Sequence, residues 1–102
     1  MLMLVSCANR NAVPSKDFSA ESLRMGGVVY ADFEKMLSAE PKDNDFTKFA
    51  SDPLNYRVIV TDDGDGFIYT FFPKDYHGRQ TMDGRVTYRA SKDGHVELKG
   101  KL

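Results

Sequence analysis

The densest cluster of groups able to do chemistry lies in the segment Asp75-Tyr76-His77-Gly78-Arg79. His77 could act as an acid or base, Arg79 could bind an anion, and Tyr76 could anchor a protein partner. No nucleophile lies beside them, and no second histidine or carboxylate pair has a spacing typical of a catalytic site. The segment therefore favours a solvated loop or a partner contact over catalysis, and we expect no enzyme activity.

Two other motifs favour structural roles. Asp62-Asp63-Gly64-Asp65-Gly66 is rich in carboxylates, but its acidic residues lack the spacing of an EF-hand loop, so we expect a hairpin turn. Gly26-Gly27 has no phosphate-loop spacing and instead favours close packing of a helix. His77, His95 and the single cysteine show no metal-ligand spacing. We therefore expect neither a metal nor a cofactor.

The single cysteine, Cys7, follows Leu4-Val5-Ser6, which resembles a bacterial lipobox: two apolar residues, a small residue, and a cysteine that is lipidated. The resemblance implies a lipid anchor to the membrane through Cys7. Ala8 after the cysteine resembles lipoproteins sorted to the outer membrane. The predicted location is therefore the bacterial cell envelope, on the outer membrane and facing the periplasm.

The segment around this motif has two interpretations. Only five apolar residues precede Ser6 and none is basic, so the predicted signal is truncated. Residues 8–15 are small and polar, as expected of a tether. We expect residues 1–17 to be a truncated lipoprotein signal and tether. The alternative is a frayed N-terminus on a cytoplasmic protein.

Composition limits what the remainder can be. The chain has 102 residues, of which 41% are hydrophobic, enough for one small domain with a core, expected over residues 18–102. A single cysteine cannot form an internal disulfide. The net charge of −1 gives the chain no electrostatic footprint for nucleic acid. The charge is uneven, with 7 basic and 11 acidic side chains in residues 1–73 and 7 basic and 4 acidic in residues 74–102.

One main helix is predicted after residue 18. Ser19 is a plausible N-cap, and Pro41 ends the element. We expect the helix to continue through Gly26-Gly27, because apolar residues form one face on both sides of the pair: Leu23, Met25, Val29, Phe33, Met36 and Leu37. A further helical turn is expected at 45–51, capped by Asn44 or Asp45.

Four strands are predicted after this helical part, over residues 56–61, 66–72, 85–90 and 95–99. The second strand is apolar on both faces, so we expect it in the interior of the sheet. Most of its aromatic residues, with Tyr56 and Tyr88, are expected to form the core: Phe67, Tyr69, Phe71 and Phe72.

The last hairpin has a predicted register. The apolar faces of its two strands coincide only if Ala90 pairs with Val96 across a three-residue loop that ends at Gly94. The same register pairs Arg89 with Glu97 and Thr87 with Lys99 on a charged solvent face. The expected fold class is therefore α+β, with one main N-terminal helix packed on a four-stranded antiparallel β-meander.

This layout resembles the helix-on-sheet unit of cystatin-like and NTF2-like domains and of PepSY-type periplasmic modules. The resemblance covers about residues 18–99 and rests on the strand segments 56–60, 63–74, 84–88 and 92–96. The inhibitor loop Q-x-V-x-G of true cystatins is absent from the sequence, so protease inhibition is not implied.

The expected function is that of a non-enzymatic binding module of the cell envelope, an inhibitor or immunity-type protein that contacts an unknown envelope protein. The expected partner-binding residues are Tyr76, His77, Arg79, Arg85 and Arg89. The alternative is a small-ligand-binding domain, or an accessory subunit of a larger envelope complex, using a cleft between helix and sheet.

Overall fold

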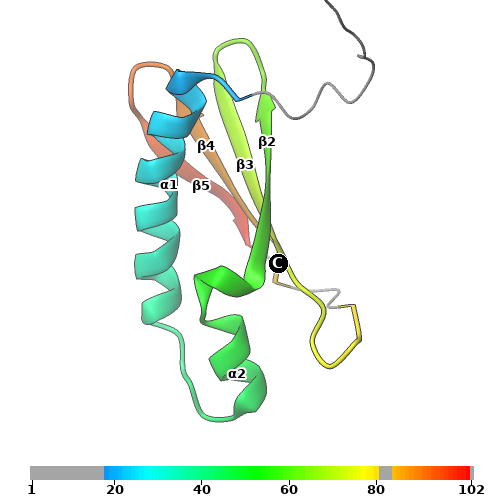
Figure 1. The fold of residues 1–102 in the computed structure, drawn as a ribbon. Helices are drawn as coiled ribbons and strands as arrows, with labels where there is room; N and C mark the ends of the chain where they lie inside the picture. The colour runs from blue at the N-terminus through cyan, green and yellow to red at the C-terminus, as the bar shows by residue number, and fades with distance from the viewer. Residues whose placement is uncertain (1–17, 81–83, 102) are drawn as a thin grey trace, which may run out of the picture.

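The computed structural model describes residues 18–80 and 84–101, so Cys7 and the predicted tether lie outside the described residues. The described part has one main helix packed on one face of an antiparallel sheet (Figure 1). The predicted α+β class is confirmed. The elements in chain order are α1 (Ala20–Ser38), α2 (Asp45–Ala50), the 3-10 helix η3 (Pro53–Asn55), β2 (Tyr56–Asp62), β3 (Gly66–Pro73), β4 (Val86–Ser91) and β5 (Val96–Lys101).

Helix α1 begins and continues as predicted. The Ser19 hydroxyl accepts a hydrogen bond from the backbone N–H of Ser22 at 3.0 Å, which satisfies a donor at the helix start. The helix is unbroken at Gly26-Gly27. A Cβ at Gly26 would lie 3.3 Å from Cε2 of Tyr69, so glycine lets the helix approach the sheet, whereas nothing lies within 4 Å of the corresponding position at Gly27.

Helix α2 is the short helical turn predicted after Pro41. Asn44 caps it: the Asn44 side chain accepts from the N–H of Thr47 at 2.9 Å, and the Thr47 hydroxyl accepts from the N–H of Asn44 at 3.0 Å. The Tyr56 hydroxyl at the start of β2 donates to the carbonyl oxygen of Ala50 at 2.6 Å. These contacts hold α2 at one end of the sheet (Figure 1).

The strands form a single meander in the order β2-β3-β4-β5, with every pair antiparallel. β3 is interior, as its apolar sequence predicted. Its alternate residues Phe67, Tyr69 and Phe71 are buried toward α1, and Phe72 lies half-buried on the opposite face. The expectation that Phe72 belongs to the core is therefore wrong, because strand alternation sends it to the other side of the sheet.

The β4–β5 hairpin confirms most of the predicted register. Ala90 pairs with Val96 and Arg89 pairs with Glu97, and Gly94 has a φ of 99° as the turn requires. The predicted Thr87–Lys99 pair is wrong. A bulge between Thr87 and Tyr88 shifts the register, so that Thr87 lies opposite Gly100.

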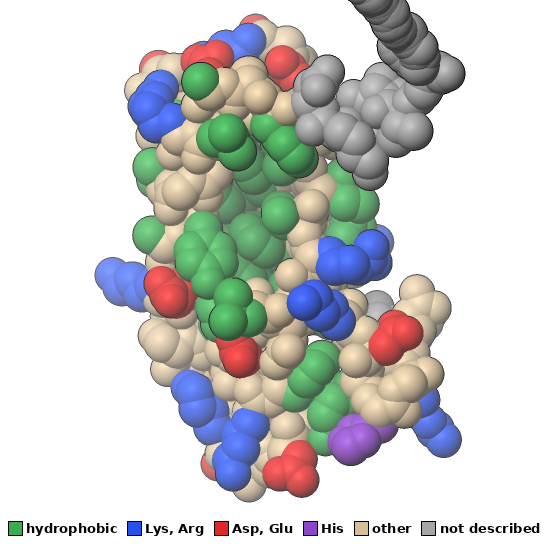
Figure 2. All heavy atoms as spheres, viewed as in Figure 1, with side chains coloured by type: hydrophobic (Ala, Val, Ile, Leu, Met, Phe, Trp, Pro, Cys, Tyr) green, Lys and Arg blue, Asp and Glu red, His purple; other side chains and the backbone are tan. Residues whose placement is uncertain are grey.

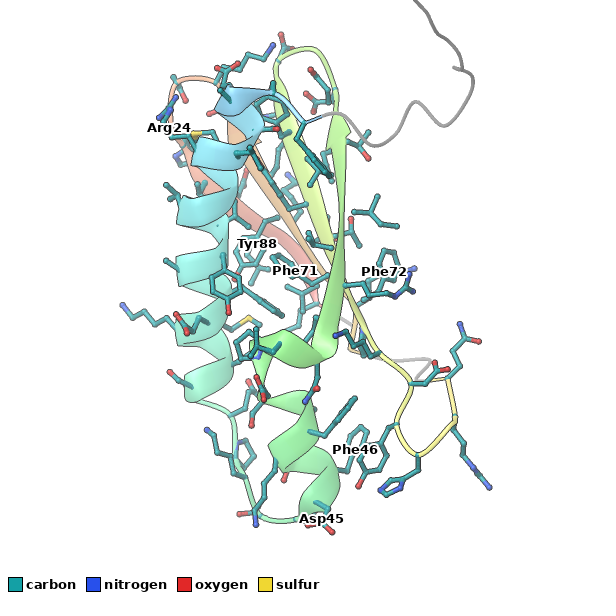
Figure 3. All side chains as sticks on the ribbon, viewed as in Figure 1. Arg24, Asp45, Phe46, Phe71, Phe72 and Tyr88 are labelled. Carbon is teal, nitrogen blue, oxygen red and sulfur yellow. The ribbon has the colours of Figure 1, made fainter. Side chains whose placement is uncertain are left out.

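Aromatic rings fill the space between α1 and the sheet. Phe33 is fully buried, stacks on Phe71 with ring centroids 3.9 Å apart, and meets Tyr56 and Tyr88 edge-on. Figure 3 shows Phe71 and Tyr88 between the helix and the sheet. The Tyr69 hydroxyl donates to the carbonyl oxygen of Ser22 at 2.6 Å, and burial raises the pKa of Tyr69 and of Tyr88.

Candidate protein-binding surface

The segment with the predicted loop cluster is a tight turn closed on itself. The N–H of Tyr76 donates to the carbonyl oxygen of Arg79 at 2.9 Å, and the N–H of Arg79 donates back to the carbonyl oxygen of Tyr76 at 3.0 Å. The two residues between them have positive φ, 51° at His77 and 74° at Gly78. This is the backbone of a type I′ turn, in which histidine is tolerated and glycine is favoured.

Tyr76 attaches this turn to α2. Its ring lies 5.2 Å from the ring of Phe46 and 4.9 Å from that of Phe49, centroid to centroid. His77 packs edge-on against the same tyrosine at 4.2 Å. Figure 3 shows Phe46 pointing from α2 toward the turn. Tyr76 is thus half-buried within the protein, and of the predicted loop residues His77 and Arg79 are the exposed ones.

We expect Tyr76→Ala to detach the turn from α2 without unfolding the sheet. The substitution removes the one ring that contacts both phenylalanines of α2, while the main core around Phe33 stays intact. Hydrogen–deuterium exchange should quicken by roughly tenfold or more in residues 45–50 and 74–79, with α1 and β3 unchanged. His77→Ala is the matched control, since it removes an exposed ring. Equal exchange in wild type and Tyr76→Ala would contradict the docking role.

Arg85 belongs to a different part of the surface. Its guanidinium carbon lies 5.9 Å from the centroid of the Phe72 ring, and that of Arg57 lies 6.0 Å from the same centroid. Phe72 is thus flanked by two arginines from the neighbouring strands. Figure 3 shows Phe72 on the side of the sheet away from α1. An aromatic ring with guanidinium groups beside it is the side-chain combination enriched at protein–protein interfaces.

Arg89 is held at the opposite end of the sheet by Asp63. Its Nε donates to Asp63 Oδ2 at 2.9 Å and its Nη2 donates to Asp63 Oδ1 at 3.2 Å, a two-bond pair. The hydrogen bond from Arg89 lowers the pKa of the Asp63 carboxyl. Asp63 Oδ1 also accepts from the N–H of Gly66 at 2.8 Å, so its carboxylate closes the β2–β3 turn. The predicted hairpin turn at 62–66 is confirmed.

These positions define a continuous surface, which we call the outer face: the side of the sheet that points away from α1. The strand registers place on it Arg57, Ile59, Thr61, Ile68, Thr70, Phe72, Thr87 and Arg89, with Arg85 beside Phe72. In the described part of the chain no helix covers this face (Figure 1). Arginines therefore lie around an apolar centre that is open to a partner.

The structure divides the predicted partner-binding residues into two groups. Arg85 and Arg89 lie on the outer face, whereas Tyr76, His77 and Arg79 form the turn docked on α2. The sequence interpretation missed Arg57 and Phe72. Their signal was the two-faced apolar pattern of residues 66–72, which placed β3 in the interior but not which side of it stays open.

A small pocket lies at the end of the sheet, between the end of α1, α2 and the start of β2. Its volume is about 240 Å³, below the roughly 300–1,000 Å³ usual for small-molecule sites. Glu40 and Lys101, which form an ion pair at 3.0 Å, both line it. It is not the cleft between helix and sheet that the ligand-binding alternative expected.

Within residues 18–80 and 84–101 no group of three or more histidine, cysteine or acidic residues is arranged to hold a metal ion. No helix in this range is long and apolar enough to cross a membrane. A scan against protein-family models found no match, and searches of curated proteins and of solved structures likewise found none. The class of the protein is therefore defined by its fold, a small α+β unit with one covered and one open sheet face.

Proposed function

We propose that this chain is a non-enzymatic binding module of the bacterial cell envelope that acts through protein–protein contact on its outer face. The observation that carries the proposal is Phe72, an aromatic ring flanked by Arg57 and Arg85 on a sheet face that no described helix covers. Planar guanidinium groups pair well with carboxylates. The partner surface that fits is therefore apolar at its centre and acidic around it.

The experiment for this surface is site-specific photo-crosslinking in the envelope fraction of the native host. A photoreactive phenylalanine analogue at position 72 should give a discrete adduct with a protein partner. The same analogue at Val28, an exposed position on α1, should give none. The double change Arg57→Glu and Arg85→Glu should reduce the position-72 adduct by at least about tenfold, as expected for loss of two charged contacts. Equal labelling from both positions would contradict the proposal.

The envelope location depends on Cys7 and has its own test. The intact mass of the chain from the membrane fraction should show a diacylglyceryl or triacyl addition on Cys7, and Cys7→Ser should remove it. An unmodified chain that begins at Met1 would exclude the anchor while leaving the outer-face proposal standing. The lipobox resemblance is the support for this part of the proposal.

Small-ligand binding is the second candidate function, and the pocket of about 240 Å³ beside α2 is the observation that favours it. A ligand there would be only a few atoms across. In that case the position-72 analogue would give no adduct, and ligand-dependent shifts in an amide NMR spectrum would fall on the residues of the pocket, such as Met36, Ala50 and Val86.

A further inference from the structure

The two edges of the sheet differ in how they are protected against pairing with another strand. β5 carries Lys99 and Lys101, and the bulge in its pairing with β4 distorts it. Lysines and bulges are devices that natural proteins use to block edge-to-edge association. β2, the other edge, has neither lysine nor proline over its seven residues, and its pairing with β3 runs from Tyr56 to Asp62 without a shift. Its free edge is therefore a regular row of backbone donors and acceptors.

The side chains along β2 are apolar and exposed on both faces of the sheet. Val58, on the face toward α1, is 47% exposed, and Ile59, on the outer face, is 51% exposed. Tyr30 of α1 is also exposed on the helix side. Figure 2 shows hydrophobic side chains gathered between α1 and β2. A strand added to this edge would cover apolar groups above and below the sheet as well as pair with the backbone.

The distribution of charge along β2 favours a second copy of the same strand, arranged antiparallel. Arg57 lies near the start of the strand, and Asp62 and Asp63 lie at its end. An antiparallel copy centred on Ile59 sets Ile59 against Ile59 and Val58 against Val60. It also brings Arg57 of each copy diagonally beside Asp63 of the other, within reach of a long side chain. A parallel copy in register would instead set the two arginines side by side.

The symmetry of this arrangement agrees with the two faces of the sheet. A twofold axis perpendicular to the sheet requires residues of the same parity to lie opposite each other, and the register centred on Ile59 meets this condition. Both α1 helices then lie on one side, and the two outer faces join on the other. We propose that two copies of this chain associate through their β2 edges, forming a continuous eight-stranded antiparallel sheet.

The first experiment measures mass in solution for the full chain carrying Cys7→Ser, which removes the native thiol. Sedimentation over about 1–100 µM, the range of weak to moderate association, should show a shift toward twice the chain mass of 11.5 kDa. Ile59→Lys should weaken association by at least about tenfold, because it sets two ammonium groups against each other at the centre. Leu98→Lys is the matched control, since Leu98 is 45% exposed on the other edge strand.

The second experiment tests the register. In the same background, Ile59→Cys should form a disulfide-linked dimer under mild oxidation, because directly opposed strand residues have Cα atoms about 4.5–5.5 Å apart. Leu98→Cys should not. Circular dichroism of each variant establishes that it is folded. A monomer throughout the concentration range, equal loss of association in the two lysine variants, or crosslinking through position 98 would each overturn the proposal.

Discussion

Phe33→Ala is expected to lower the free energy of unfolding by about 3–5 kcal/mol, which for a domain of this size is a large part of the total. Phe33 is fully buried and touches aromatic rings from β2, β3 and β4. Truncation leaves a cavity between the helix and three strands, which the stacked partner Phe71 cannot fill without leaving its own position in the sheet.

Thermal or urea denaturation followed by circular dichroism measures this loss. The midpoint temperature should fall by about 15–30 °C. Tyr30→Ala is the matched control: it truncates another aromatic residue of α1, but one that is 36% exposed, so its effect should be below about 1 kcal/mol. Equal effects of the two substitutions would mean that the helix is not held on the sheet by the Phe33 cluster.

Gly66→Ala is expected to destabilise the fold nearly as strongly, at or above the upper end of the roughly 1–3 kcal/mol that overpacking costs. A Cβ at Gly66 would lie 2.4 Å from the carbonyl oxygen of Ala90 and 2.9 Å from Cα of Ser91. Both atoms belong to the backbone of the neighbouring strand β4. A side chain could rotate away from such a contact, but a strand in the interior of a sheet can yield only if the pairing of β3 with β4 opens.

Gly27→Ala provides the opposite expectation at a glycine of the same chain. Nothing lies within 4 Å of a Cβ at Gly27, and alanine favours the interior of a helix by about 1 kcal/mol over glycine. The midpoint of urea denaturation should therefore rise for Gly27→Ala and fall for Gly66→Ala. A rise for both would show that the close approach of β3 and β4 at Gly66 does not constrain the sheet.

The two proposed interaction surfaces use different parts of the sheet and can be occupied together. The partner surface is centred on Phe72, and the self-association surface is the backbone edge of β2. Arg57 is the residue common to both, since it flanks Phe72 and lies near the start of the edge strand. Changes at Arg85 should therefore act on partner contact alone, and changes at Ile59 on both self-association and the outer face.

The parts of the structure that were predictable are those set by neighbouring residues in the chain. Ser19 caps α1, and the face of Met25, Val29 and Phe33 has the spacing of a helix, so the main helix could be predicted from local pattern. The pairing of Ala90 with Val96 follows from one turn with glycine at its last position. Two of the five predicted partner residues, Arg85 and Arg89, lie on the open sheet face.

The wrong predictions depended on contacts between distant segments. Strand alternation identifies Phe71 and Phe72 as facing opposite ways, but only the position of α1 decides which of them is buried. The bulge opposite Thr87 and Tyr88 changes the partner of Thr87 without a glycine or proline at that residue to announce it.

The sequence by itself determined the elements of this protein, their antiparallel order and the turn chemistry, because capping, hydrophobic period and glycine conformation act over a few residues. Only the tertiary structure decided that Tyr76 is held by α2, that Phe72 lies between two arginines on an open face, and that β2 is the unprotected edge. Each of these depends on which face α1 covers and on which strands lie outermost. That choice is made by the burial of the aromatic core as a whole, not by any single segment.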